Sequence, residues 1–252
     1  MAELSFETHG DRSSPAIVLV HALGTDRRFW DDVVADLKSD FFCITPDLQA
    51  AGATPIPATP VTAEQHAADV IALADSLGVQ QFAIAGCALG GMVGAVIAAK
   101  VPDRVTALVM TNPGLRNLPE VKEMLKQRTI DVVEKGMEFL LPAATEKSFH
   151  NQPHDERYDR FVAGYRAVDP KAYASSVLGF LEIDIEPYLP QIRCPVLLIP
   201  GGQDLLMPPE AATTIQQGLS NARVVRFEEA AHFIPYQAPD RLASEMRGFL
   251  AG

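Results

Sequence analysis

The sequence predicts an α/β protein in which a mostly parallel, doubly wound sheet is covered by helices on both faces. Short apolar runs alternate along the chain with longer runs of helical periodicity, which is the pattern of strands buried on both sides. The chain has 252 residues, of which 48% are hydrophobic and 21% charged, a composition typical of a soluble globular protein. We therefore expect a single domain over residues 1–252.

Six runs are predicted strands because each is short, apolar and bounded by turn residues. They cover residues 16–20, 41–45, 82–85, 105–111, 195–199 and 224–227. Before the third run, Thr62 and Gln65 have the spacing of a capping box at the start of a helix, and Gly78 is placed to end that helix. A last helix begins near Pro239. The core-facing stripes of these two helices are Ala67, Val70, Ile71, Ala74 and Leu77, and Leu242, Ala243, Met246, Phe249 and Leu250.

The alternation stops between residues 117 and 190, where no strand-like run occurs. Three or four helices are predicted there, one of them opened by Asp169 as N-cap and Pro170 as first residue. Open α/β sheets bind ligands beyond the carboxyl ends of their strands. We therefore expect residues 117–190 to form a helical cap, or lid, over a site at that edge.

Charge and cysteine content restrict the partners and the compartment. The formal net charge of −11 disfavours binding to nucleic acid or to anionic membranes. Cys43, Cys87 and Cys194 are an odd number, and the first ten residues show no basic segment followed by an apolar one, so we expect a cytoplasmic protein without a disulfide framework. Four glycines interrupt the most apolar stretch, residues 82–101, which favours a strand and a buried helix over a membrane span.

Residues 86–92, GCALGGM, follow the third predicted strand. Gly86 and Gly90 lie two residues before and after Ala88, and a strand, a tight turn with these glycines and a helix together are the pattern of a nucleophile elbow. Alanine stands at the central position, where the elbow presents its nucleophile. Its methyl group cannot attack a carbonyl carbon, so the pattern predicts an elbow without a nucleophile.

Partners for such an elbow follow the last two strands. Asp204 and His232 come in the order that the elbow pattern requires, which assigns His232 as general base and Asp204 as the group that orients it. The segment 21–24, HALG, follows the first predicted strand, where this kind of sheet places an oxyanion donor. The backbone amides of Leu23 and Leu89 are the predicted oxyanion hole, the second of them at a helix N-terminus.

With these motifs the sequence resembles the α/β-hydrolase family over nearly its whole length, and within it the 3-oxoadipate enol-lactonases and related small lactone and ester hydrolases. The stretches that carry the resemblance are LGTDRRFWDDVVADL, AGCALGGMVG, DPKAYASSVLGFLEIDIEPYLPQIRCPVLLIPGGQD and AAHFIPYQAPDRL. The resemblance implies an α/β-hydrolase fold, the triad positions 88, 204 and 232, and no cofactor. Two departures are Ala88 itself and the loop 46–52, PDLQAAG, where relatives commonly have D-x-x-G-x-G.

Contacts to a substrate are expected from the first of these stretches and from the lid. The candidate in the first stretch is Trp30. The candidates in the lid are Arg128, Arg157, Arg160 and Arg166, because guanidinium groups bind carboxylates in a bidentate manner. His150 and His154 have the spacing of a metal pair, but Pro153 disfavours the helical turn that would align them, so no metal is predicted. The sequence leaves the oligomeric state open, a homo-oligomer included.

Two other interpretations of the elbow segment are weaker. A Cys87 nucleophile would have Ala85 and Leu89 at the positions that need very small residues, and Leu89 is too large. A dinucleotide fingerprint needs the spacing G-x-G-x-x-G after the first strand, whereas this spacing is G-x-x-x-G-G after the third.

Three functions stay open at this point. The first is a hydrolase of small, carboxylate-bearing lactones or esters whose nucleophile is replaced by Ala88, so that this form is inactive, through natural divergence or through engineering. The second is an enzyme that needs no nucleophile and uses His232 and Asp204 as a general base, such as a lyase, an isomerase or a cofactor-free oxygenase. The third is a ligand-binding relative without catalysis. Because the elbow glycines, Asp204 and His232 are all present, the sequence favours the first.

Overall fold

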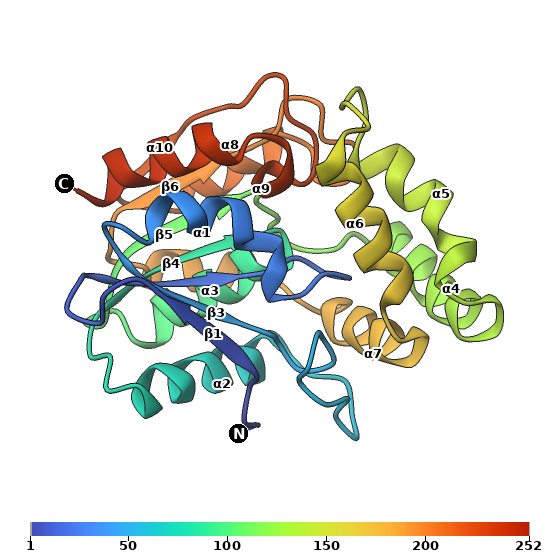
Figure 1. Ribbon diagram of the computed structural model, residues 1–252, viewed down its shortest axis with the longest axis horizontal. Helices are drawn as coiled ribbons and strands as arrows, with labels where there is room; N and C mark the ends of the chain where they lie inside the picture. Colours follow the sequence, from blue (N-terminus) through green and yellow to red (C-terminus); the bar gives the residue numbers. More distant parts are fainter. Residues whose placement is uncertain (1, 252) are drawn as a thin grey trace.

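The computed structural model describes residues 2–251 and contains a seven-stranded sheet with the strand order β1-β3-β2-β4-β5-β6-β7 (Figure 1). The first strand runs antiparallel to β3, and every other neighbouring pair is parallel. The strands are β1 (Phe6–His9), β2 (Ala16–Val20), β3 (Phe42–Pro46), β4 (Phe82–Cys87), β5 (Val105–Thr111), β6 (Val196–Ile199) and β7 (Ala222–Val224). The predicted α/β class is therefore confirmed.

Helices cover both faces of this sheet. On one face α1 (Asp31–Leu37) packs against α10 (Pro239–Leu250), and on the other α2 (Ala63–Ser76) packs against α3 (Leu89–Lys100) (Figure 1). The remaining helices of the core are η1 (Arg27–Trp30), α8 (Glu210–Gln217) and α9 (Ile234–Gln237). The stretch 82–101 thus forms β4 and the buried helix α3, and no helix in the described part of the chain is long and apolar enough to cross a membrane.

The predicted strands agree with the sheet in its interior and differ at its edges. The bounds of β2 and β5 are as predicted, and those of β3, β4 and β6 differ by one or two residues. The last strand was predicted at 224–227 but ends at Val224, because beyond it only Phe227 forms a single bridge, to Gly201. The prediction missed β1, a short edge strand with mostly exposed side chains.

The local signals at helix ends are confirmed. The Thr62 side chain accepts a hydrogen bond from the Gln65 amide at 3.3 Å, and the Gln65 side chain accepts one from the Thr62 amide at 2.8 Å. After this helix Gly78 has a φ of +73°, a conformation that glycine adopts without strain. The carboxylate of Asp169 accepts hydrogen bonds from the amides of Lys171 and Ala172 at 2.7 and 3.0 Å, and so opens the next helix, in which Pro170 is the first residue.

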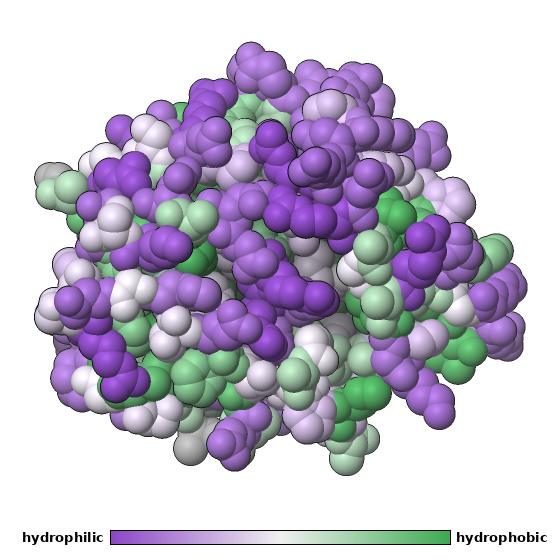
Figure 2. All heavy atoms as spheres, viewed as in Figure 1, coloured by the Kyte–Doolittle hydropathy of each residue, from purple (hydrophilic) through white to green (hydrophobic). Residues whose placement is uncertain are grey.

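Four helices lie between β5 and β6. They are α4 (Pro119–Lys135), α5 (Met137–Ser148), α6 (Glu156–Ala167) and α7 (Pro170–Phe180), and the short η2 (Glu186–Gln191) follows them. In Figure 1 they form a group at the right of the sheet, with α4 packed against α7 and α5 against α6. Figure 2 shows apolar patches on this side of the molecule among polar side chains. We call this group the inserted helices; their action as a lid stays a prediction.

Candidate active site

The turn between β4 and α3 holds Ala88 in a strained backbone conformation. Its φ of +46° and ψ of −110° lie in a region that residues with a Cβ seldom adopt and that costs on the order of 1–3 kcal/mol. Two hydrogen bonds keep the turn in place, from the Ala88 amide to the Thr111 carbonyl at 3.1 Å and from the Met92 amide to the Ala88 carbonyl at 3.0 Å. The turn has the shape that a nucleophile elbow requires, with a methyl group as its central side chain.

Both flanking glycines are required by close backbone approach. A Cβ on Gly86 would lie 2.2 Å from the carbonyl carbon of Gly90, and a Cβ on Gly90 would lie 2.2 Å from the carbonyl oxygen of Val20. Backbone atoms of a buried strand and helix cannot move aside as the end of a flexible side chain can. The two glycines therefore allow α3 to begin directly against β2 and β4.

We expect Gly90→Ala to lower the free energy of unfolding by about 3 kcal/mol, because the added methyl group would overlap the Val20 carbonyl. Gly248→Ala is the matched control: Gly248 lies in α10 with open space around its Cα. There the same change should stabilise the chain by about 0.5–1 kcal/mol. Urea unfolding of the two variants measures the contrast, and equal midpoints would contradict the close approach of the turn to β2.

The side chains of Asp204 and His232 are joined by a hydrogen bond. The distance between His232 Nδ1 and Asp204 Oδ2 is 2.9 Å, and the Asp204 side chain is fully buried. Asp204 Oδ1 accepts the amides of Leu206 and Met207 at 2.8 and 2.9 Å. Burial by itself raises the pKa of Asp204, but the charge of His232, its hydrogen bond and the two amides outweigh burial and leave the pKa below its ordinary value. The carboxylate is thus ionised at neutral pH.

Asn112, at the end of β5, is a further member of this group. Its Nδ2 donates to Asp204 Oδ2 at 2.9 Å and to the carbonyl oxygen of Ala231 at 2.7 Å. It thereby fixes the acid and the residue before the histidine together, from a backbone with a φ of +48°. The sequence shows only that no carboxylate stands at this strand end. The position of Asn112 at the end of the strand next to β4 is the one signal in the sequence that could have identified it. Its hydrogen bonds could not be predicted, because they join it to residues 92 and 119 positions away.

These bonds define what the histidine can do. With Nδ1 donating to Asp204, the other ring nitrogen, Nε2, is left as a proton acceptor, which is the tautomer of a general base. The His232 amide donates to the carbonyl oxygen of Ser148 at the end of α5, at 3.2 Å. The loop that carries the base is therefore attached to the inserted helices.

The predicted oxyanion donors line one cavity. Leu23 and Leu89 belong to the wall of a cavity of about 560 Å³, and Leu89 is the first residue of α3. Among residues 2–251 neither amide donates to another protein group. His21 shapes the loop that carries Leu23, since its Nδ1 bonds to the Ala22 carbonyl at 2.9 Å and its Nε2 accepts the Leu48 amide at 3.0 Å. Both predicted donors therefore belong to residues that line one cavity, and both lack a protein acceptor in the described part of the chain.

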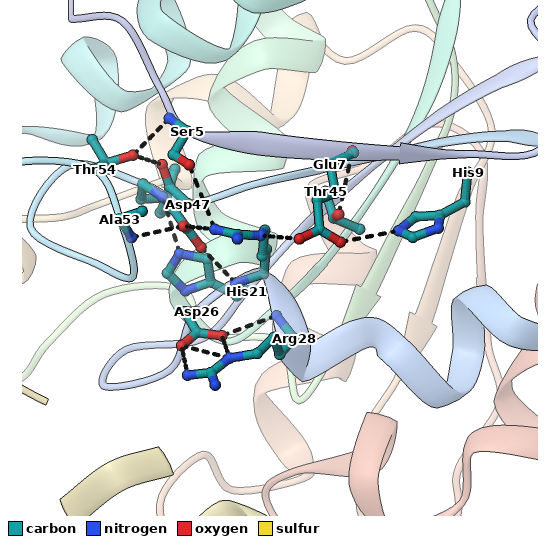
Figure 3. Close-up of polar contacts among 12 residues, drawn as sticks. Ser5, Glu7, His9, His21, Asp26, Arg28, Thr45, Asp47, Ala53 and Thr54 are labelled. Carbon is teal, nitrogen blue, oxygen red and sulfur yellow. Dashed lines mark hydrogen bonds and ion pairs between the residues drawn. The ribbon is translucent and has the colours of Figure 1, made fainter. Parts of the chain in front are cut away.

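A buried carboxylate holds the neighbouring loop 46–52. Asp47 accepts the amides of Arg27 and Ala53 at 2.8 and 2.9 Å and forms an ion pair with the Arg27 guanidinium. Figure 3 shows this network beside His21, with the Asp26 and Arg28 pair next to it. Ala50, at the first glycine position of the pattern D-x-x-G-x-G, has a positive φ of +62°. The loop thus keeps a left-handed residue at that position although its glycine is missing.

Two buried histidines lie in the wall of the same cavity. Burial lowers the pKa of both, that of His66 to about 4, and the proximity of His21 adds to the effect on His66. The Nδ1 of His66 is buried and has no hydrogen-bond partner in the described part of the chain. Both rings are therefore neutral at pH 7.

The buried His66 predicts a loss of stability in mild acid. Its folded pKa of about 4 lies below the unfolded value of 6.5, so the unfolded chain binds more protons between these pH values. The neutral, buried imidazole therefore contributes about 3 kcal/mol to the free energy of unfolding above pH 6.5, and this contribution is lost as the pH falls to 4. Urea unfolding from pH 7 to pH 4 should therefore show a shallower loss for His66→Gln, whereas His154→Gln, at an exposed site, should follow the parent. Parallel curves for all three chains would refute the prediction.

The predicted substrate contacts differ in their surroundings. Trp30 is fully buried, edge to face with Phe29, which corrects the expectation that it contacts a substrate, because a side chain without exposed surface reaches no ligand. Arg160 pairs with Asp32, Arg166 with Glu138 and Arg157 with Asp155. Within residues 2–251, the side chain of Arg128 donates to the Tyr173 hydroxyl, at 3.3 Å, and to no other group.

Cys87 does not fit the role of a nucleophile. Its side chain is fully buried and its Sγ lies 3.6 Å from the Asn112 side-chain oxygen and from the His232 carbonyl oxygen. Burial raises the pKa of the thiol, so it is not a thiolate at neutral pH.

The comparisons with known proteins agree with this geometry. The family model described as "alpha/beta hydrolase fold" matches residues 15–239. The chain belongs to the α/β-hydrolase family. It is related to 3-oxoadipate enol-lactonase 2 of Acinetobacter baylyi, 28% identical over 204 residues, which are 80% of this chain and 76% of that protein. A putative carbamate hydrolase, RutD of Caulobacter sp. (strain K31), is 27% identical over 260 residues, covering 99% and 96% of the two chains.

A solved structure extends this likeness to three dimensions. A thermophilic esterase from Thermogutta terrifontis, studied with malate bound, superimposes with a TM-score of 0.90 at 26% identity and covers 98% of this chain and 93% of that one. The relatives are hydrolases, so the fold and the family together make this chain a hydrolase.

Proposed function

We propose that the chain is a hydrolase of small, carboxylate-bearing lactones or esters in which alanine occupies the position of the nucleophile. The observation that carries this proposal is the strained backbone at Ala88. An alanine gains nothing from a conformation that costs on the order of 1–3 kcal/mol. The conformation is useful only for directing a nucleophilic side chain out of the sheet toward a bound acyl group.

With a serine at position 88, each remaining group has a defined task. The hydroxyl oxygen would bond to the acyl carbon while His232 Nε2 takes its proton, and the Leu23 and Leu89 amides would hold the oxyanion. The bond to the leaving oxygen then breaks, and that oxygen takes the proton from His232. Water activated by His232 would release the acid and restore the serine. With Ala88, the chain can bind a substrate but cannot form the acyl-enzyme.

The substrate class is supported by the cavity and by the relatives. A cavity of about 560 Å³ suits a small molecule. The segment 117–190, which contains the inserted helices, would close over this cavity as a lid. One relative is named an enol-lactonase, and the esterase with a similar fold was solved with malate, a small dicarboxylate. We expect the reaction to take place in the cytoplasm and to need no cofactor.

The test is the Ala88→Ser variant, assayed with a panel of short esters, lactones and a carbamate, half of each class bearing a carboxylate. Hydrolysis by the variant and not by the parent supports the proposal. A parent chain that converts any of these compounds, with the activity lost in His232→Ala, would instead support a base that needs no nucleophile. Inactivity of the variant on the whole panel overturns the proposal.

A further inference from the structure

One arginine of the inserted helices has no carboxylate beside it in the described part of the chain. Arg157, Arg160 and Arg166 each lie beside a carboxylate, whereas Arg128 on α4 has no carboxylate partner among residues 2–251. The residue Arg128 is also partly buried. A desolvated cation without a counter-ion is costly unless a ligand supplies the charge.

Two buried tyrosines surround this guanidinium. Tyr173 on α7 accepts its hydrogen bond at 3.3 Å, and Tyr165 on α6 lies with its ring 5.7 Å from that of Tyr173. Burial and the neighbouring Tyr173 raise the pKa of Tyr165, so its hydroxyl remains a hydrogen-bond donor at any working pH. Three of the inserted helices thus converge on one cluster, which we call the Arg128 cluster: Arg128, Tyr165 and Tyr173.

This cluster lies against the loop that carries Leu23, one of the two predicted oxyanion donors. A Cβ built on Gly24, the residue after Leu23, would lie 3.0 Å from Cε2 of Tyr165 and 3.1 Å from Cε2 of Tyr173. Each Cε2 is bonded to the carbon that carries the hydroxyl group, so the polar ends of both rings lie beside the loop. Tyr173 also lines the cavity that contains Leu23 and Leu89. A ligand with its acyl group at these amides would therefore share the cavity with Tyr173, the member of the cluster that accepts the Arg128 hydrogen bond.

We infer that the Arg128 cluster is the binding site for the substrate's carboxylate, at the end of the molecule away from the acyl group that reacts. The inference rests on the proposed function and adds the residues that select an anionic substrate. With a net charge of −11 the protein repels anions at long range, so a local cation must supply the attraction. A guanidinium and two hydroxyls can together donate to both oxygens of one carboxylate.

Two substrates of equal chain length test the inference in the Ala88→Ser background: monomethyl glutarate, which bears a carboxylate, and dimethyl glutarate, which does not. We expect Arg128→Met to lower kcat/KM for the monoester by about 10-fold to 100-fold, the usual effect of a lost charged hydrogen bond, and to change that of the diester by less than about threefold. Arg223→Met is the matched control, because its guanidinium is paired with Glu245 at the surface, on β7 and away from the inserted helices, and it should change neither. A parallel fall with both esters, or none with either, overturns the inference.

A binding experiment keeps this result separate from the proposed hydrolysis. Titration of the parent chain with glutarate needs no turnover, and Arg128→Met should raise the Kd of glutarate at least about 10-fold, whereas Arg223→Met should not. Lost glutarate binding without hydrolysis in any serine variant would support the cluster and overturn the proposed function. Equal glutarate binding by the parent and Arg128→Met, with active diester hydrolysis, would overturn the cluster alone. If Arg128→Met fails to fold, Arg128→Gln, which keeps donors without the charge, takes its place in both experiments.

Discussion

Ala88→Ser is expected to raise kcat for a cleaved ester or lactone by about 10⁴-fold to 10⁶-fold over the parent. Removing the nucleophile of a triad costs on the order of 10⁶-fold in kcat, and oxyanion stabilisation with substrate binding leaves about 10³-fold over water. The gain would depend on the His232 to Asp204 hydrogen bond of 2.9 Å, on the Leu23 and Leu89 amides, which donate to no acceptor among residues 2–251, and on the strained turn. Steady-state assays at neutral pH with the preferred compound of the panel give the ratio.

Two variants show whether such a gain comes from the elbow. Cys87→Ser introduces a hydroxyl one residue earlier, at a fully buried position, and should not gain activity. Ala88→Ser combined with His232→Ala should return to within about 10-fold of the parent, because triad members act as a unit. A serine variant whose rate is indifferent to His232 would contradict the assigned base even if it were active.

The order of the motifs along the chain was enough to predict that Asp204 and His232 lie together, because a parallel sheet fixes where its strands end. Residues at the carboxyl ends of neighbouring parallel strands lie at one edge, so the positions 88, 204 and 232 could be placed together without coordinates. The elbow glycines were also predictable, since a turn between a strand and a helix leaves no room for a Cβ. Local signals such as the capping box of Thr62 depend on neighbours three residues away.

What the sequence could not predict depends on contacts between distant segments. The edge strand β1 is fixed by pairing with β3 and not by its own, mostly exposed, side chains. No sequence pattern distinguishes the four arginines of the inserted helices from one another. Arg160 differs from Arg128 because its guanidinium reaches Asp32, 128 residues earlier in the chain. Asn112 likewise gains its role from partners 92 and 119 residues away. The packed structure is therefore needed to distinguish Arg128 from the other arginines of the inserted helices.

Asp204→Asn, made in the Ala88→Ser background, should lower kcat about 10⁴-fold and leave KM within a few-fold, because an aspartate that orients the base acts mainly in the transition state. The surroundings of Asp204 make the isosteric amide unsuitable in either orientation. Oδ2 receives His232 Nδ1 and Asn112 Nδ2, and Oδ1 receives two backbone amides. An NH₂ group at either position would face donors, so unfolding should also become easier by about 1–3 kcal/mol.

The pH profile and a control variant separate the role of Asp204 from a general loss of charge. Against the effect of burial, the charge and hydrogen bond of His232 and two backbone amides hold the pKa of Asp204 below its ordinary value. We therefore expect the acid limb of kcat/KM in the serine variant to report the general base and not this carboxylate. Asp204→Asn should therefore move or abolish that limb, since it removes the charge that stabilises the imidazolium. Glu146→Gln, which removes an exposed charge from α5, should leave rate and profile unchanged. An Asp204→Asn chain that keeps both the rate and the acid limb would show that the buried carboxylate serves only the fold.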